Sequence, residues 1–280
     1  MAALIWTCPS CKASLTTPFC PRCGEEPLKP RDLTLRGFAE KAVHAFTSID
    51  ARTLRSIRTL VRRPGELTVA WLSGIRKPYV LPLSLFLIAN VTFVAAQWAT
   101  GQHVFSSSLD SHLHHQDWSS LAKLLLSERL HETGRTIEEY RPTFDRKVAV
   151  NAKSLVMLMS LAFSLLLPIV FLRERRPFIA HVVFSLHLYA FLLLLMSAAL
   201  LVAALSGLLG FGGIDTPVVD NLLSVAMVLI CAVYVYRAIP PVYGSHGAVR
   251  AVSAAFLVLA VAVLVLGYRL ALFFITLYST

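Results

Sequence analysis

The sequence predicts an all-α integral membrane protein with about five transmembrane helices. The first reason is composition: 56% of the 280 residues are hydrophobic and 15% are charged, whereas soluble domains carry about 25% charged residues. The second is that long apolar stretches recur along the chain, and such stretches are solvated by lipid. The composition therefore excludes an ordinary soluble globular protein and leaves no room for a large soluble catalytic domain.

Four of the five cysteines lie within the first 23 residues, in the motifs CPSC and CPRCG. A CxxC pair presents two thiolates to one ion, and two pairs complete the tetrahedral four-sulfur shell of a zinc ribbon. Residues 1–30 are therefore predicted to bind Zn²⁺ through Cys8, Cys11, Cys20 and Cys23, and Gly24 lets the backbone turn behind the second pair. So short a module cannot fold alone, so the metal is expected to supply most of its stability. Two disulfides or a redox pair are the alternatives.

Residues 31–78 have the periodicity of amphipathic helices but are too charged to cross a bilayer. Apolar residues recur at three- and four-residue spacing from 35 to 49, and Asp50 can cap a second helix. Its apolar stripe consists of Leu54, Ile57 and Val61. Its basic stripe consists of Arg52, Arg55, Arg58 and Arg62. Pro64 and Gly65 end this helix, and residues 66–75 are expected to form a third, short one.

The basic stripe predicts a negatively charged partner. Residues 1–78 hold 13 Lys and Arg against 6 Asp and Glu. Directly before a membrane span, the favoured interpretation is an interfacial helix whose apolar face enters the headgroup boundary while its arginines meet anionic lipid. A protein partner is the alternative. Nucleic acid is not expected, because no aromatic stacking platform or recognition fold accompanies the arginines.

Five apolar stretches are long enough to cross about 30 Å of hydrocarbon at about 1.5 Å per residue. The predicted spans are 79–98, 153–172, 178–206, 218–236 and 251–275. They make residues 79–280 a transmembrane domain with a polar external loop at 99–152. This loop carries five histidines, but HLHH and His131-Glu132 lack the spacing of HExxH. A helix is expected after Asp117, with Trp118, Leu121, Leu125 and Leu130 on its apolar face. For the rest of the loop, a weakly structured segment is favoured over a metal site.

The distribution of basic residues predicts the orientation of the chain. The side that holds residues 1–78, 173–177 and 237–250 has 18 Lys and Arg, and the opposite side has 6. The positive-inside rule therefore places the N-terminus in the cytoplasm and the C-terminus outside. A reducing compartment also suits a thiolate metal site. The opening run MAALIW is too short for a signal peptide.

Several segments resemble an uncharacterised family of bacterial multipass membrane proteins, described as a domain of unknown function. The matching segments are the CPxCG-type ribbon, RDLTLRGF (31–38), the LVRRPGELTVAWLSGIRKPYVLPLSLFLIANVTF block (60–93), AKSLV (152–156), HVVFSLHLYAF (181–191) and VYGSHGAVRA (242–251). The resemblance implies a zinc ribbon joined to a multipass domain in the bacterial inner membrane. It supplies no catalytic residue.

Polar residues inside the predicted spans are functional candidates, because polar groups are costly in hydrocarbon. Three of them are expected near the midplane: Asn90, Ser164 and His187. Asn90 and His187 can satisfy each other by a hydrogen bond, or can form a ligand or proton site. His181 is expected at the inner interface, facing headgroups.

Near the outer interface, Asp220 and Arg269 are predicted to lie at similar heights and to form an ion pair. The alternative is that Arg269 reaches lipid phosphates alone.

These features predict a non-enzymatic inner-membrane protein, a membrane-anchored zinc ribbon that recruits a partner or senses the bilayer. An enzyme is not expected, because the sequence has no paired intramembrane carboxylates, HExxH, GxSxG or Walker loop. The alternative is a small-solute or lipid transporter that uses a polar layer around His187.

Overall fold

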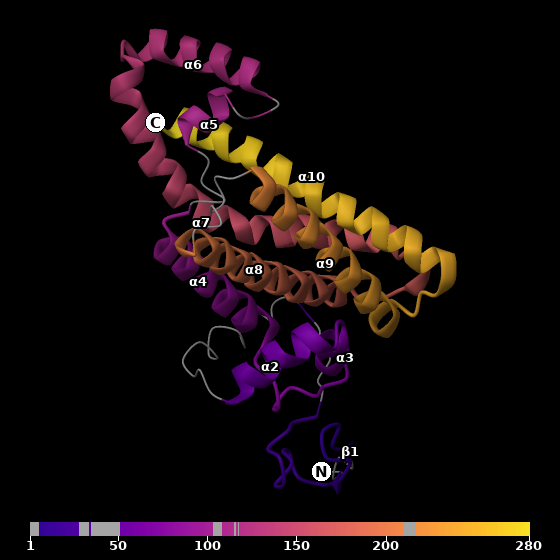
Figure 1. Ribbon diagram of the computed structural model, residues 1–280. Coiled ribbons are helices and arrows are strands. Elements are labelled where there is room, and N and C mark those ends of the chain that lie inside the picture. The colour runs from indigo at the N-terminus through magenta and orange to yellow at the C-terminus, as the bar shows by residue number, and fades with distance from the viewer. Residues whose placement is uncertain are drawn as a thin grey trace. The chain divides into compact units, whose positions relative to one another are not determined.

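A computed structural model describes residues 6–27, 34, 51–102, 108–114, 116, 118–209 and 217–280 (Figure 1). The predicted helix between residues 35 and 49 lies outside these ranges. Along the chain the elements are β1 (Trp6–Thr7), β2 (Ser14–Leu15), α2 (Ala51–Arg62), α3 (Glu66–Leu72), α4 (Pro82–Thr100), α5 (Leu109–His114), α6 (Ser119–Thr133), α7 (Ile137–Val170), the 3₁₀ turn η2 (Leu172–Glu174), α8 (Phe178–Leu208), α9 (Pro217–Tyr243) and α10 (Gly247–Ser279).

The described residues contain four helices long and apolar enough to cross a membrane: α4, α8, α9 from Asn221 onward, and α10. The two parts of α7, Ile137–Ala152 and Met157–Val170, meet at a bend of 50° and count as a fifth span if taken together. Large apolar side chains on these helices are exposed, for example Leu205 (56%), Leu229 (60%) and Val263 (57%). Such surfaces suit lipid rather than water. The predicted all-α membrane fold with about five spans is confirmed.

The chain divides into two compact units, residues 1–100 with 164–258 and residues 101–163 with 259–280. In the first unit, α4 packs along α8 (Figure 1). The buried residues of α4 recur at three- and four-residue spacing, which makes one stripe along the helix. They are Pro82, Ser84, Leu85, Phe86, Ala89, Phe93 and Ala96. The opposite face is exposed at Val91 (66%) and Trp98 (77%).

The short helix α3 lies against α8 and α9 in the same unit. Its N-cap, Gly65, has φ 86°, a conformation that side chains disfavour. A Cβ atom at Gly65 would lie 2.6 Å from the carbonyl oxygen of Ala238 and 2.7 Å from Cγ of Pro241. The absence of a side chain at Gly65 therefore lets the start of α3 touch the backbone of α9.

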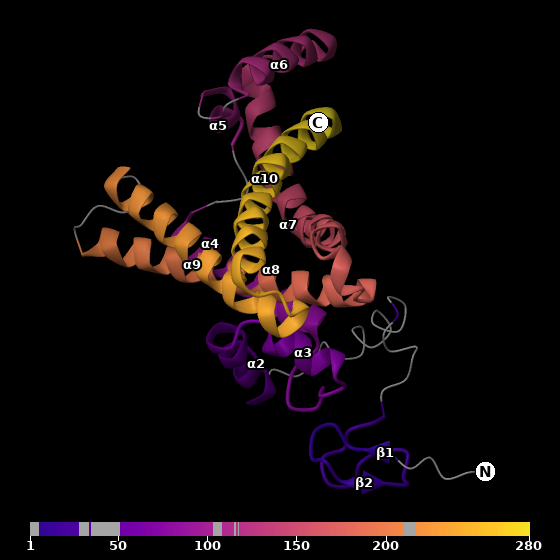
Figure 2. The same cartoon turned by 90° about the vertical axis from the view of Figure 1, so that its right-hand side faces the viewer.

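The second unit joins α5, α6 and the first part of α7 to the last turns of α10 (Figure 2). The hydroxyl of Tyr140 donates to the carbonyl of Leu277 at 3.0 Å, and Nδ2 of Asn151 donates to the hydroxyl of Thr276 at 3.1 Å. The expectation of a weakly structured loop at 99–152 is wrong for its described part. Rings such as Phe144 and Phe273, both fully buried, give this segment an apolar core that no local pattern revealed.

The predicted apolar face of α6 also needs correction. Ala122 and Leu126 are buried, whereas Leu121 is 45% exposed. One residue turns a helix by about 100°, so the observed face is rotated by about one residue from the predicted one. The helix ends at Gly134, whose φ of 63° is that of a left-handed C-cap.

Candidate metal centre

The four predicted metal ligands lie on two knuckles with the same backbone hydrogen bonds. The N–H of Lys12 donates to the carbonyl of Cys8 at 2.9 Å, and the N–H of Gly24 donates to the carbonyl of Cys20 at 2.7 Å. Both donors are in the left-handed region, with φ 59° at Lys12 and 73° at Gly24. In the sequence, Gly24 indicated the turn behind the second cysteine pair, because glycine readily adopts a positive φ. Nothing in the sequence indicated that Lys12 adopts the same conformation.

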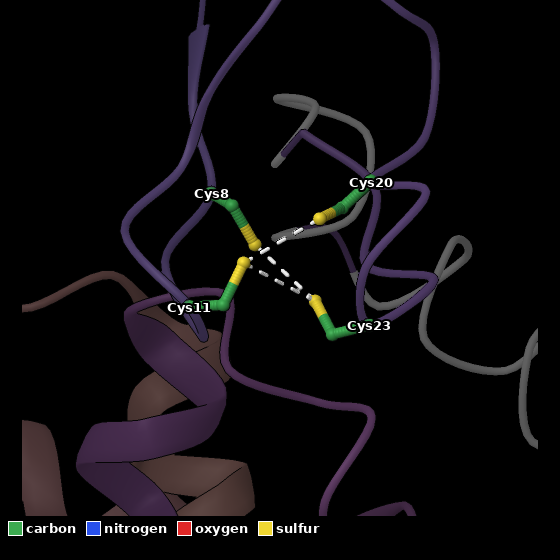
Figure 3. A group of neighbouring side chains, drawn as sticks. All are labelled: Cys8, Cys11, Cys20 and Cys23. Carbon is green, nitrogen blue, oxygen red and sulfur yellow. Dashed lines mark hydrogen bonds between the residues drawn. The ribbon is translucent and has the colours of Figure 1, made fainter.

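Figure 3 shows the sulfur atoms of the four cysteines gathered around one point. The Sγ–Sγ distances are 3.4 Å for Cys8 and Cys23, 3.5 Å for Cys11 and Cys20, and 3.9 Å for Cys11 and Cys23. All four atoms lie within 4.8 Å of one another. A disulfide needs about 2.05 Å, whereas four metal–sulfur bonds of about 2.3 Å in a tetrahedron separate the sulfurs by about 3.8 Å. The cysteines are free thiols placed so that they can hold a metal ion.

Around Cys20 the backbone favours the thiolate form, which is the form that binds metal. At Cys11 and Cys23 a backbone hydrogen bond is outweighed by burial and the neighbouring thiols, which raise the pKa. Burial raises the pKa of the Cys20 thiol, but hydrogen bonds from the backbone of Cys23 and Arg22 oppose it, and the resulting pKa is about 7. Metal binding by the cluster would release the remaining protons from its thiols.

One carboxylate beside this cluster was missed by sequence reasoning. Glu25 follows the second knuckle and is 3% exposed. Its Oε2 accepts hydrogen bonds from the hydroxyl of Ser10 at 2.7 Å and from the N–H groups of Arg76 and Lys77 at 3.2 Å each. In the sequence Glu25 is indistinguishable from its neighbour Glu26, which is exposed.

The predicted stripes of α2 are both at its surface. The protein buries Thr53, Ser56 and Leu60 instead, while Leu54 and Val61 are 72% and 51% exposed. On a helical projection the apolar stripe lies between this buried face and the arginines. Of the basic residues, Arg52 is partly exposed and the others are exposed, namely Arg55, Arg58 and Arg62.

The buried histidine His187 has a partner that the sequence did not indicate. Its Nδ1 lies 2.8 Å from the hydroxyl of Thr68, a fully buried residue of α3. The suggested partner, Asn90, is half-buried on α4, and Ser164 is fully buried on α7. Because α3 packs against α8 rather than lying apart from it, Thr68 satisfies the ring nitrogen.

The expectation that His181 faces headgroups is wrong. His181 is 2% exposed, and its Nδ1 lies 3.0 Å from the hydroxyl of Tyr243 on α9. The ring of Tyr243 also stacks on Phe171, with 3.8 Å between the ring centroids. The physical reason is that the start of α8 is covered by the end of α9 and by the residue that follows α7, which exclude it from the interface.

The predicted ion pair between Asp220 and Arg269 stays a prediction, because the side chain of Asp220 lies outside the described part of the structure. Arg269 is half-buried on α10. Non-additive effects of Asp220→Asn and Arg269→Gln in a double-mutant cycle would support the pair.

Residues 50–94 match the model of a family described as "Protein of unknown function (DUF3667)". This segment contains α2, α3 and the first part of α4, including Gly65 and Thr68. No curated protein and no solved structure matches the chain. The chain is thus similar, over α2, α3 and the first part of α4, to a family of unknown function.

Proposed function

We propose that this chain is a non-enzymatic protein of the bacterial inner membrane, in which a cytoplasmic zinc ribbon serves as an interaction or sensing module. The observation that carries the proposal is the cluster of four free thiols next to a set of membrane-spanning helices. Four thiolates at these separations suit Zn²⁺, which favours tetrahedral sulfur ligation. A closed four-sulfur shell leaves no position for substrate, which supports a structural rather than a catalytic ion.

The metal proposal is tested on the full-length protein, purified in detergent under reducing conditions. We expect one zinc per chain by mass spectrometry, and we expect Cys20→Ser to lose it while the protein still inserts into the membrane, because insertion depends on the apolar helices. Cys231→Ser is the matched control, since Cys231 is a buried cysteine of α9. Equal zinc content in both variants would contradict the proposal.

We also propose that α2 lies on an anionic lipid surface. The stripe of Leu54, Ile57 and Val61, bordered by arginines, supports this proposal, because Leu54 and Val61 are exposed and Ile57 is half-buried. Lipid acyl chains would cover the stripe while phosphates neutralise the guanidinium groups. Binding of an acidic protein at the same face is the competing outcome.

The lipid proposal is tested by hydrogen exchange of α2 in nanodiscs. Exchange should be slower with phosphatidylglycerol than with phosphatidylcholine. Arg58→Gln should reduce the ratio of the two exchange rates about fivefold, since one basic residue near such a surface contributes about 1 kcal/mol. Arg63→Gln is the control, because Arg63 pairs with Glu66 at 3.2 Å. Exchange that ignores lipid charge would favour a protein partner.

A transporter of small solutes or lipids around His187 is the second candidate. His187 lines a cavity of about 10 Å³ together with Trp71, Arg76 and Tyr79. That volume holds about one water molecule, so transport would require the cavity to open. Unchanged growth and metabolite profiles of a His187→Gln strain would weigh against this candidate.

A further inference from the structure

The carboxylate of Glu25 connects the cysteine cluster to the polypeptide that precedes α4. Its Oε2 accepts from Ser10, which lies between the cysteines of the first knuckle, and from two backbone N–H groups of the α3–α4 loop, residues 73–81. A carboxylate that is 3% exposed requires such donors, because an unpaired buried charge is costly.

The α3–α4 loop is also a wall of the cavity beside His187. Ile75, Arg76 and Tyr79 line this cavity, and the guanidinium of Arg76 lies 4.7 Å from the centroid of the Trp71 ring. Glu25 accepts hydrogen bonds from the backbone N–H groups of Arg76 and Lys77. The carboxylate therefore holds the backbone that carries the Arg76 side chain. A displacement of Glu25 would therefore release one wall of the cavity.

The position of Glu25 depends on the cysteine cluster. Ser10 belongs to the first knuckle and Glu25 follows the second, and they meet where the two knuckles converge on the four-cysteine cluster. The hairpin that joins β1 to β2 has two residues in each strand, and so short a hairpin is not stable by itself. Without metal, the knuckles would separate and the Ser10–Glu25 hydrogen bond would be lost.

We propose that Glu25 is a metal-dependent latch, which transmits the occupancy of the four-cysteine site to the α3–α4 loop and the cavity of His187. The proposal rests on metal binding by the ribbon, as proposed above. Loss of zinc by chelation releases the N–H groups of Arg76 and Lys77 from Glu25. The latch gives the module a route by which the metal occupancy of the ribbon reaches the membrane-spanning helices.

Hydrogen exchange of the amides of Arg76 and Lys77 tests the latch in the full-length protein in nanodiscs. In the zinc-loaded protein both amides should be protected, and a zinc chelator should accelerate their exchange about tenfold or more, as expected for the loss of hydrogen bonds to a charged acceptor. Glu25→Ala should accelerate it equally while zinc is still bound. Glu26→Ala, which removes the neighbouring exposed carboxylate, should leave exchange unchanged.

Zinc content measured on the same samples separates the two proposals. Retained zinc with unchanged exchange in Glu25→Ala would overturn the latch and leave the metal site standing. Retained zinc in the untreated protein, with amides that stay protected after complete chelation, would also overturn the latch. A wild-type protein that holds no zinc would overturn the metal site, and with it the latch.

Discussion

At the scale of single residues, we expect the buried ring of His112 to make the stability of the second unit depend on pH. His112 is fully buried, its Nδ1 accepts a hydrogen bond from Nε1 of Trp118 at 3.4 Å, and its ring lies 5.0 Å from that of Phe273. Its Nε2 has no hydrogen-bond partner among the described residues. Burial, together with the positive charge of Arg269, lowers the pKa of His112 from 6.5 to about 4.

This pKa predicts an acid-sensitive contact. The unfolded state binds the proton more tightly, so the stabilisation is complete above about pH 6.5 and is lost as the pH falls toward 4, by about 3 kcal/mol in total. Thermal unfolding in detergent at pH 7 and pH 4.5 measures this loss. His112→Phe should lessen the pH dependence, whereas His131→Gln, a change at an exposed histidine of α6, should leave it intact. The same acid sensitivity in all three proteins would contradict the assignment.

Some of the residues discussed above can be recognised from a local sequence motif, and others cannot. Two CxxC pairs are a specific sequence motif, and they indicate a metal site without any knowledge of the fold. Glu25, Thr68 and His112 have no such signature. Each is defined by a partner at least six residues away, namely the loop at 76–77, His187 and Trp118, so its role depends on a tertiary contact.

At the scale of the elements, the approach of α3 to α9 depends on Gly65. Gly65→Ala should lower the free energy of unfolding by about 2 kcal/mol or more, because it combines a left-handed φ with a Cβ 2.6 Å from the Ala238 carbonyl. Gly134→Ala is the matched control, since Gly134 also has positive φ but nothing within 4 Å of its Cβ position. Denaturant titration of both variants measures the difference. Equal losses would show that the α3–α9 contact contributes nothing.

Periodicity predicts a helix more securely than it predicts which face is buried. In α2 the periodicity predicts the helix, but no pattern in the sequence indicates that Ser56 and Leu60 are buried while Leu54 of the apolar stripe is exposed. The hydroxyl of Ser56 accepts from the N–H of Val80 at 3.0 Å, so a polar contact with the chain before α4 sets the orientation of the helix. An apolar stripe on a helix beside a membrane can be covered either by protein or by lipid. The hydrophobic pattern alone does not tell which of the two covers it.

At the scale of the whole molecule, orientation in the bilayer is the main open prediction. The last turns of α10 bond to the first part of α7 within one unit, for example through Tyr140 and Leu277. This contact supports a common side of the membrane for the C-terminus and the start of α7. If the basic N-terminal side is cytoplasmic, the C-terminus is expected outside. Alkaline phosphatase fused after Thr280 should then be active, and a fluorescent protein fused there should not fluoresce. The reverse pattern would place the C-terminus inside.

The sequence by itself determined the membrane class, the helical character and the four-cysteine cluster. Hydropathy, helical period and CxxC spacing depend on neighbours within a few residues, so they can be recognised without a fold. Only the tertiary structure decided which polar groups satisfy one another. Glu25 with residues 76–77, Thr68 with His187, and His181 with Tyr243 are joined across 51, 119 and 62 positions in the chain. In a low-dielectric interior an unpaired polar group is costly, and tertiary packing determines which group, anywhere in the chain, becomes its partner.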